Sequence, residues 1–145
     1  MEIVRRLTAP CDPSTLFAHV DDLESYPVWM DLVHRVDRVG DEPLWNVELQ
    51  AKVGPFARSK RLRMRRTELV VDRLAVFERD EADDRDHAPW TLRAELTPRG
   101  ELRTELVMTL VYGGSLWSGA VLQRVLDDKV AAGSNALLTL VSTTP

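Results

Sequence analysis

The sequence has few residues that could stabilise a fold through a disulfide or a bound metal. It has one cysteine in 145 residues, Cys11, which excludes an internal disulfide and a zinc site built from cysteines. Charges break its apolar runs well before the roughly 20 residues of a membrane-spanning helix. No apolar run of signal-peptide length follows the N-terminus. We therefore expect a chain in a reducing, cytoplasmic setting.

The sequence also lacks an excess of positive charge. Its 19 Lys and Arg stand against 23 Asp and Glu, a net charge of −4, which disfavours a general nucleic-acid-binding protein. The charged fraction of 29% and hydrophobic fraction of 44% indicate a folded chain. We expect one domain, residues 1–145. At this size folding buries about 70% of the chain's surface, so no disulfide or metal is needed for stability.

Motifs of metal or covalent chemistry are missing as well. The three histidines, His19, His34 and His87, are scattered and have no metal-ligand spacing. The segment 113–117 lacks the closing glycine of a nucleophile elbow, and no glycine-rich phosphate loop is present. We expect no metal and no cofactor, and the sequence assigns no catalytic residue.

What the sequence does contain is hydrophobic periodicity. Apolar and polar residues alternate as they do in half-buried strands. Besides a short first strand at 3–7, strands are predicted at 45–53, 56–67, 70–79, 90–96 and 102–112. Their short connections favour an antiparallel meander.

Helices are predicted on both sides of these strands. Asp12 is a good N-cap and Pro13 fits the first position of a short helix. Asp21 or Asp22 is expected to cap a second short helix, whose continuation Pro27 limits. A long helix with one apolar face is predicted over 116–140, and it must pack on the sheet. The fold class is α+β: a curved antiparallel sheet of six to seven strands wraps around the C-terminal helix, with two short helices after the first strand.

Two segments carry a resemblance to a known superfamily. Residues 9–17 place a proline before an amphipathic helix, and residues 22–29 end in a Tyr-Pro-x-Trp element. Together with the turn at 53–56 and the Gly-Gly pair at 113–114, this resembles bacterial members of the START-like helix-grip (SRPBCC) superfamily. That superfamily includes lipid-transfer domains, polyketide cyclases and coenzyme-Q-binding proteins. The resemblance covers nearly the whole chain and implies a helix-grip fold.

The resemblance also implies a function. A cavity between the sheet and the C-terminal helix would hold a hydrophobic or amphipathic small molecule, such as a lipid, a polyketide or an isoprenoid-like compound. Two alternatives stay open. One is an enzyme of the polyketide aromatase/cyclase type, which the lack of a convincing inward acid–base pair disfavours. The other is an accessory protein of a quinone or dehydrogenase system that acts at a membrane or a partner.

The inward phases of the predicted elements supply the candidate ligand-binding residues. The apolar candidates are Trp45, Leu62, Met64, Trp90, Leu92, Met108, Leu110, Leu122 and Leu126.

Three polar residues are candidates for orienting the ligand. Arg66 continues the phase of its strand, Tyr112 ends the last strand, and Lys129 lies in the apolar seam of the long helix. Each has an ordinary interpretation too, because Arg66 and Lys129 can reach solvent and a core tyrosine often has a wet tip.

A basic strip and an acidic segment follow each other in the sequence. Residues 58–66 carry six positive charges, and residues 78–86 have a net charge of −4. If the two segments are neighbours, their outward charges pair across strands, and we favour this interpretation. The alternative is contact with a peripheral membrane surface or an acidic partner through Arg61, Arg63 and Arg65. Few aromatic residues interleave the strip, so we expect no nucleic acid. Both a monomer and a homodimer are compatible with the sequence.

Overall fold

The computed structural model describes residues 1–113 and 120–142, without the side chains of Val53 and Leu122. Seven strands form one antiparallel sheet in the order β1-β7-β6-β5-β4-β3-β2. The strands are β1 (Glu2–Ala9), β2 (Val33–Arg38), β3 (Leu44–Val53), β4 (Phe56–Val70), β5 (Leu74–Arg79), β6 (Trp90–Pro98) and β7 (Thr104–Tyr112). This architecture confirms the predicted α+β fold.

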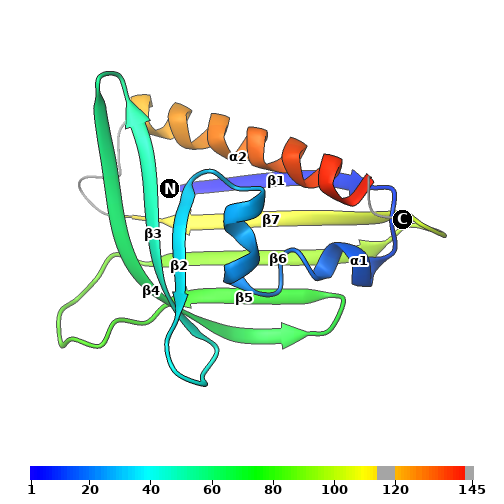
Figure 1. Ribbon diagram of the computed structural model, residues 1–145, viewed down its shortest axis with the longest axis horizontal. Coiled ribbons are helices and arrows are strands. Elements are labelled where there is room, and N and C mark those ends of the chain that lie inside the picture. Colours follow the sequence, from blue (N-terminus) through cyan, green and yellow to red (C-terminus); the bar gives the residue numbers. More distant parts are fainter. Residues whose placement is uncertain (114–119, 143–145) are drawn as a thin grey trace.

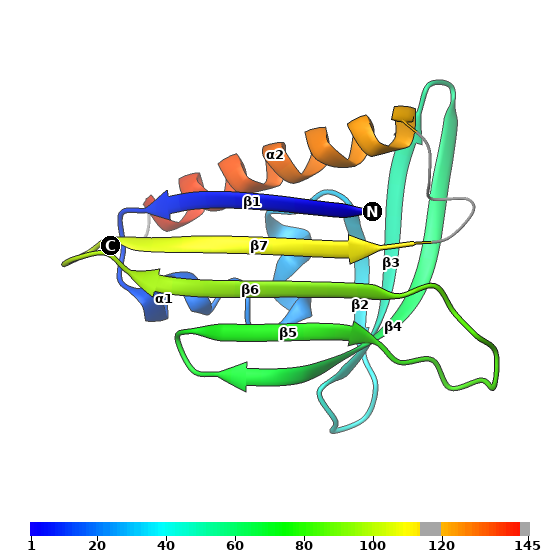
Figure 2. The ribbon, with the colours of Figure 1, turned by 180° about the vertical axis from the view of Figure 1, so that it is seen from behind.

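The helices lie together on one face of the sheet (Figure 1). They are α1 (Pro13–Phe17), the 3₁₀ helix η1 (Leu23–Val28) and α2 (Ala120–Ser142). The long helix α2 runs beside β1 and also packs on β3 (Figure 1). The opposite face of the sheet carries no helix of the described chain (Figure 2). Residues 116–119, where the long helix was predicted to begin, lie outside the described residues. None of the described helices is long and apolar enough to cross a membrane.

The two short helices begin where the sequence predicts. Asp12 caps α1 by accepting a hydrogen bond from the N–H of Thr15 (2.9 Å). Asp22 caps η1 by accepting a hydrogen bond from the N–H of Glu24 (2.8 Å). Pro27 does not limit the second helix, because it lies inside η1. The fixed φ angle of proline is compatible with a 3₁₀ helix, which explains why that prediction was wrong.

Strand β4 is longer than predicted and has two partners. Its residues 56–65 pair with β3, and its residues 64–70 pair with β5. The predicted break after residue 67 is replaced by a bulge between Arg66 and Glu68, and the chain turns only at 71–73. A bulge lets a strand bend without ending.

Backbone groups of β4 are satisfied where pairing with β5 stops. The carbonyl of Arg63 accepts a hydrogen bond from the N–H of Asp80 (2.8 Å). The N–H of Arg63 donates to Oε1 of Glu81 (3.1 Å), which also accepts from Nε of Arg79 (2.9 Å). From this point β2, β3 and the first half of β4 turn away and cross the direction of β5, β6 and β7 (Figures 1 and 2). The turn makes the sheet concave toward the helices.

We predict that Glu81→Ala lowers the free energy of unfolding by about 1–3 kcal/mol. It removes the acceptor of the Arg63 N–H and one of the two acceptors of the largely buried Arg79 guanidinium, which keeps the carbonyl of Ala88. Urea denaturation followed by tryptophan fluorescence measures this change. Glu78→Ala is the matched control, since Glu78 is an exposed glutamate of β5 whose side chain makes no hydrogen bond or ion pair in the described chain. Equal destabilisation by the two variants would contradict the role of Glu81.

Candidate functional site

An apolar cavity of about 90 Å³ lies between the concave face of the sheet, the segment around η1 and the helix α2. Its described lining residues come from eight helices and strands and from one connection, and all of them have aliphatic, aromatic or methionine side chains. They are Ile3, Leu23, Tyr26, Met30, Leu32, Val33, Val47, Leu49, Leu62, Met64, Trp90, Leu92, Met108, Leu110 and Val130.

Strand alternation builds most of this lining. Side chains two residues apart point to the same face of a strand, so each of β3, β4, β6 and β7 contributes two residues. The register then brings these pairs side by side across the strands. Val47 of β3 faces Leu62 of β4, and Leu92 of β6 faces Leu110 of β7. The cavity wall therefore follows from the pleat and the strand register.

Six of the apolar candidates predicted from the sequence lie in this lining. They are Leu62, Met64, Trp90, Leu92, Met108 and Leu110. Trp45 and Leu126 are fully buried but do not line the cavity. The indole N–H of Trp45 donates to Oε1 of Glu24 (3.0 Å), which places this ring in the core beneath η1. The side chain of Leu122 lies outside the described part of the chain.

Arg66 faces the inner side of the sheet, but it does not line the cavity. Its guanidinium donates to the carbonyl of Asp21 (2.7 Å) and lies over the ring of Trp45, 5.7 Å from the centroid. Arg66 therefore fastens the chain before η1 to strand β4.

Tyr112 is buried beside the cavity residue Trp90, with 5.2 Å between ring centroids, and does not itself line the cavity. Its hydroxyl donates to Oε1 of Gln123 (2.7 Å). Burial raises the pKa of Tyr112, and Asp127 raises it further. This phenol thus links the end of β7 to the first turns of α2.

Lys129 does not line the cavity, and its placement corrects the predicted helix face. Its Nζ lies 3.5 Å from Oδ2 of Asp31, and about a third of its side chain is exposed. The apolar seam that the sequence predicts for α2 contains Lys129, and it is displaced by about one residue from the observed row of buried residues. The buried positions of α2 are Leu126, Val130, Gly133, Leu137 and Val141.

Sequence reasoning missed several lining residues. Val130 follows Leu126 by one helical turn, a signal that was present in the sequence. Leu49 belongs to the alternation of β3, so its inward direction could also be predicted from the sequence. Met30 and Leu32 lie in the connection between η1 and β2, where no periodicity exists to indicate their direction.

Polar atoms of the lining residues are turned away from the space. The hydroxyl of Tyr26 donates to the carbonyl of Val20 (2.9 Å), and the indole N–H of Trp90 donates to the carbonyl of Gly113 (3.1 Å). Burial strongly raises the pKa of Tyr26, which is the one titratable residue in the described lining. A space with such walls is apolar and suits an apolar guest better than water.

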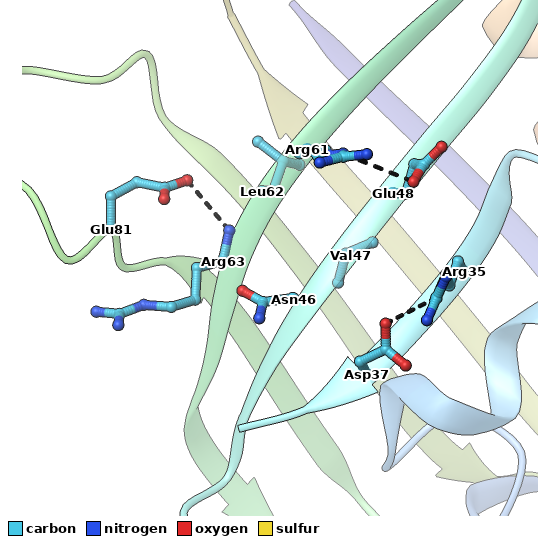
Figure 3. A pocket seen from close by; sticks show the side chains of 9 residues that line it. All are labelled: Arg35, Asp37, Asn46, Val47, Glu48, Arg61, Leu62, Arg63 and Glu81. Carbon is cyan, nitrogen blue, oxygen red and sulfur yellow. Dashed lines mark hydrogen bonds and ion pairs between the residues drawn. The ribbon is translucent and has the colours of Figure 1, made fainter. Parts of the chain in front are cut away.

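A second, larger hollow of about 420 Å³ lies on the outer face of β2, β3 and β4 (Figure 3). Three arginines and three carboxylates dominate its lining, and they largely engage one another. Arg35 pairs with Asp37 at 2.8 Å, and Arg61 approaches Glu48 at 3.7 Å. Its charges are therefore compensated locally, and the smaller apolar cavity is the better candidate site. The complete lining is Arg35, Asp37, Asn46, Val47, Glu48, Arg61, Leu62, Arg63 and Glu81.

The outward arginines of the basic strip differ in how they are engaged. Arg65 lies 2.7 Å from Asp80 and 3.3 Å from Glu42, and Arg63 donates to the carbonyl of Asp80. The hydrogen bond from Arg65 lowers the pKa of Asp80. Arg61 is 87% exposed at the side chain. Contact of this strip with a membrane or an acidic partner stays a prediction.

Comparison with protein families finds one match. The model of the family described as polyketide cyclase/dehydrase and lipid transport matches residues 9–138. No curated protein matches the sequence.

Solved structures share the fold at low sequence identity. A START superfamily protein from Mycobacterium smegmatis has a TM-score of 0.72 and 15% identity, covering 97% of both chains. A conserved protein from Geobacillus kaustophilus has a TM-score of 0.75 and 11% identity, covering 98% of this chain and 95% of its own. The Zhui aromatase/cyclase from Streptomyces sp. R1128 has a TM-score of 0.68 and 16% identity, covering 98% and 93%.

A glycine of α2 sets how closely the helix approaches the cavity. A Cβ atom added to Gly133 would lie 2.6 Å from Cε and 2.8 Å from Sδ of Met30, and 3.3 Å from the carbonyl oxygen of Trp29. Those distances are shorter than nonbonded carbon contacts allow. Met30 lines the cavity, so the missing side chain of Gly133 gives Met30 its position.

We predict that Gly133→Ala reduces the uptake of xenon, which enters dry apolar cavities, because the new methyl group displaces Met30. Shifts of methionine methyl NMR signals under xenon measure the uptake. The helix propensity of alanine contributes up to about 1 kcal/mol and offsets part of the cost of overpacking. Urea denaturation of the variant then separates reduced uptake from loss of folding. Asn135→Ala, at an exposed position of the same helix, should leave uptake unchanged, and adding Met30→Ala to Gly133→Ala should restore it. Unchanged uptake in Gly133→Ala alone would refute the role of Gly133.

Proposed function

The chain belongs to the polyketide cyclase/dehydrase and lipid transport family, and from this premise we propose that it binds a small hydrophobic or amphipathic molecule in the cavity under α2. The observation that carries the proposal is the lining itself. Fifteen residues from distant parts of the chain surround one space, and their polar atoms are turned toward backbone carbonyls.

Affinity in such a site comes from removing apolar surface from water. Each Å² of buried apolar surface contributes about 25 cal/mol, and the lining offers little else to a ligand. Selectivity then depends on the size and shape of the apolar part of the ligand. A lipid chain, a polyketide or an isoprenoid-like compound has this chemistry.

The size of the cavity narrows the choice of ligand. Clefts that hold drug-sized ligands enclose roughly 300–1,000 Å³, whereas this cavity encloses about 90 Å³. Three of its lining residues, Met30, Met64 and Met108, have flexible side chains that can move to enlarge the space. We therefore propose a slim ligand, such as a single apolar chain, in preference to a broad fused-ring compound.

Among the functions of this family, we favour ligand binding without catalysis. Cyclisation of a poly-carbonyl chain needs proton transfer from positioned groups. Tyr26 is the one titratable residue of the described lining, and its hydroxyl is engaged by the carbonyl of Val20. The likeness to the Streptomyces aromatase/cyclase is one of fold at 16% identity. It carries no argument for the same reaction.

We predict that the protein binds the neutral single-chain ligand 1-decanol and that Leu110→Trp abolishes this binding. Leu110 lies in the cavity wall, so an indole there fills the space. Shifts of the methionine methyl NMR signals during a titration with decanol measure the binding, because Met30, Met64 and Met108 line the cavity.

Val111→Trp is the matched control, because Val111 is the next residue of β7 and points to the other face of the sheet. Equal loss of decanol binding in both variants would locate the alcohol elsewhere. A wild-type protein that does not bind decanol would refute the proposed function.

A further inference from the structure

Lys60 stands at one end of the cavity wall. It is half-buried and lies on the same face of β4 as the lining residues Leu62 and Met64. Its neighbour across the strands is Leu49, and its Nζ lies 5.9 Å from the ring centroid of Trp90. Lys60 therefore lies beside lining residues from three strands, with its ammonium group over the ring of Trp90.

The face of β4 that carries Lys60 passes from water into the cavity. Phe56 is 72% exposed, Arg58 is exposed, Lys60 is half-buried, and Leu62 is buried. Lys60 thus occupies the boundary between solvent and the apolar space. An amphiphile that inserts its tail among Leu62 and its neighbours would leave its head group at this level.

The ammonium of Lys60 has no carboxylate at ion-pair distance in the described chain. The charged groups that act on its pKa are Arg79 and Glu81, and the carboxylate of Glu81 already accepts from Arg79 and from the N–H of Arg63. Burial lowers the pKa of Lys60, Arg79 lowers it further, and Glu81 opposes them. Two cations and one anion leave this end of the cavity with an excess of positive charge.

We propose that Lys60 binds the carboxylate head group of a single-chain amphiphile whose apolar tail lies in the cavity. The inference rests on the proposed function and specifies its ligand class. A carboxylate supplies the charge that this end of the cavity lacks. It also accepts charge-assisted hydrogen bonds, which are stronger than neutral ones.

The test compares decanoate with 1-decanol, which have the same chain length and differ in the charge of the head group. Titrations followed by the shifts of the methionine methyl NMR signals give the affinity of each ligand, because three methionines line the cavity. We expect Lys60→Met to weaken decanoate binding by about tenfold and to change decanol binding by less than about twofold, because it removes a charge-assisted hydrogen bond and little apolar contact. Lys60→Arg keeps the charge and should retain decanoate binding.

Lys52→Met is the matched control. Lys52 is an exposed lysine on the outward face of the neighbouring strand β3, so its loss changes net charge equally without touching the cavity. If decanoate binds Lys60→Met as tightly as wild type, or if both ligands weaken equally, the head-group inference is overturned while decanol binding by wild type still supports the proposed function. If wild type binds neither ligand, the proposed function itself fails. Lys60→Gln provides a polar replacement should the methionine variant not fold.

Discussion

The change of partner along strand β4 is the constraint on which this structure depends. Its first part pairs with β3, its last part pairs with β5, and only Met64 and Arg65 pair with both. A strand cannot leave a neighbour without exposing backbone donors and acceptors. Asp80 and Glu81 satisfy those of Arg63, and the sheet can then bend around the helices instead of continuing flat. The concave face that forms the cavity wall follows from this bend.

The charged residues of the basic strip have two different roles in this structure. On the outward face, Arg63 and Arg65 hold the segment after β5 against β4 through Asp80. On the inward face, Arg66 fastens the chain before η1, and Lys60 stays at the end of the cavity without a carboxylate partner in the described chain. Alternation along a strand separates these roles, because neighbouring residues face opposite sides of the sheet. A net charge computed for the strip hides that division.

Helix α2 and the connection after η1 form part of the cavity wall, and their fit depends on small contacts. Gly133 lets Met30 and the carbonyl of Trp29 lie close to the helix. Tyr112 reaches from β7 to Gln123 on the helix. Interiors are packed closely enough that one added methyl group is felt, so these contacts set the volume left for a ligand. The flexible methionines in the wall give that volume some freedom.

The sequence by itself determined the α+β class, the caps of the two short helices and the inward phase of the strands. Six of the nine apolar candidates lie in the cavity lining because period-two alternation reports directly which side chains share a face. The tertiary structure alone decided the rest. The ion pair of Lys129 with Asp31 depends on how α2 is rotated on the sheet, and the hydrogen bond of Arg66 depends on the position of Asp21. Met30 lines the cavity from a connection that has no periodicity. Periodicity states which way a side chain points along its own element. It cannot state which distant segment lies opposite, and that opposite segment determines whether a charge is paired, packed or left facing a cavity.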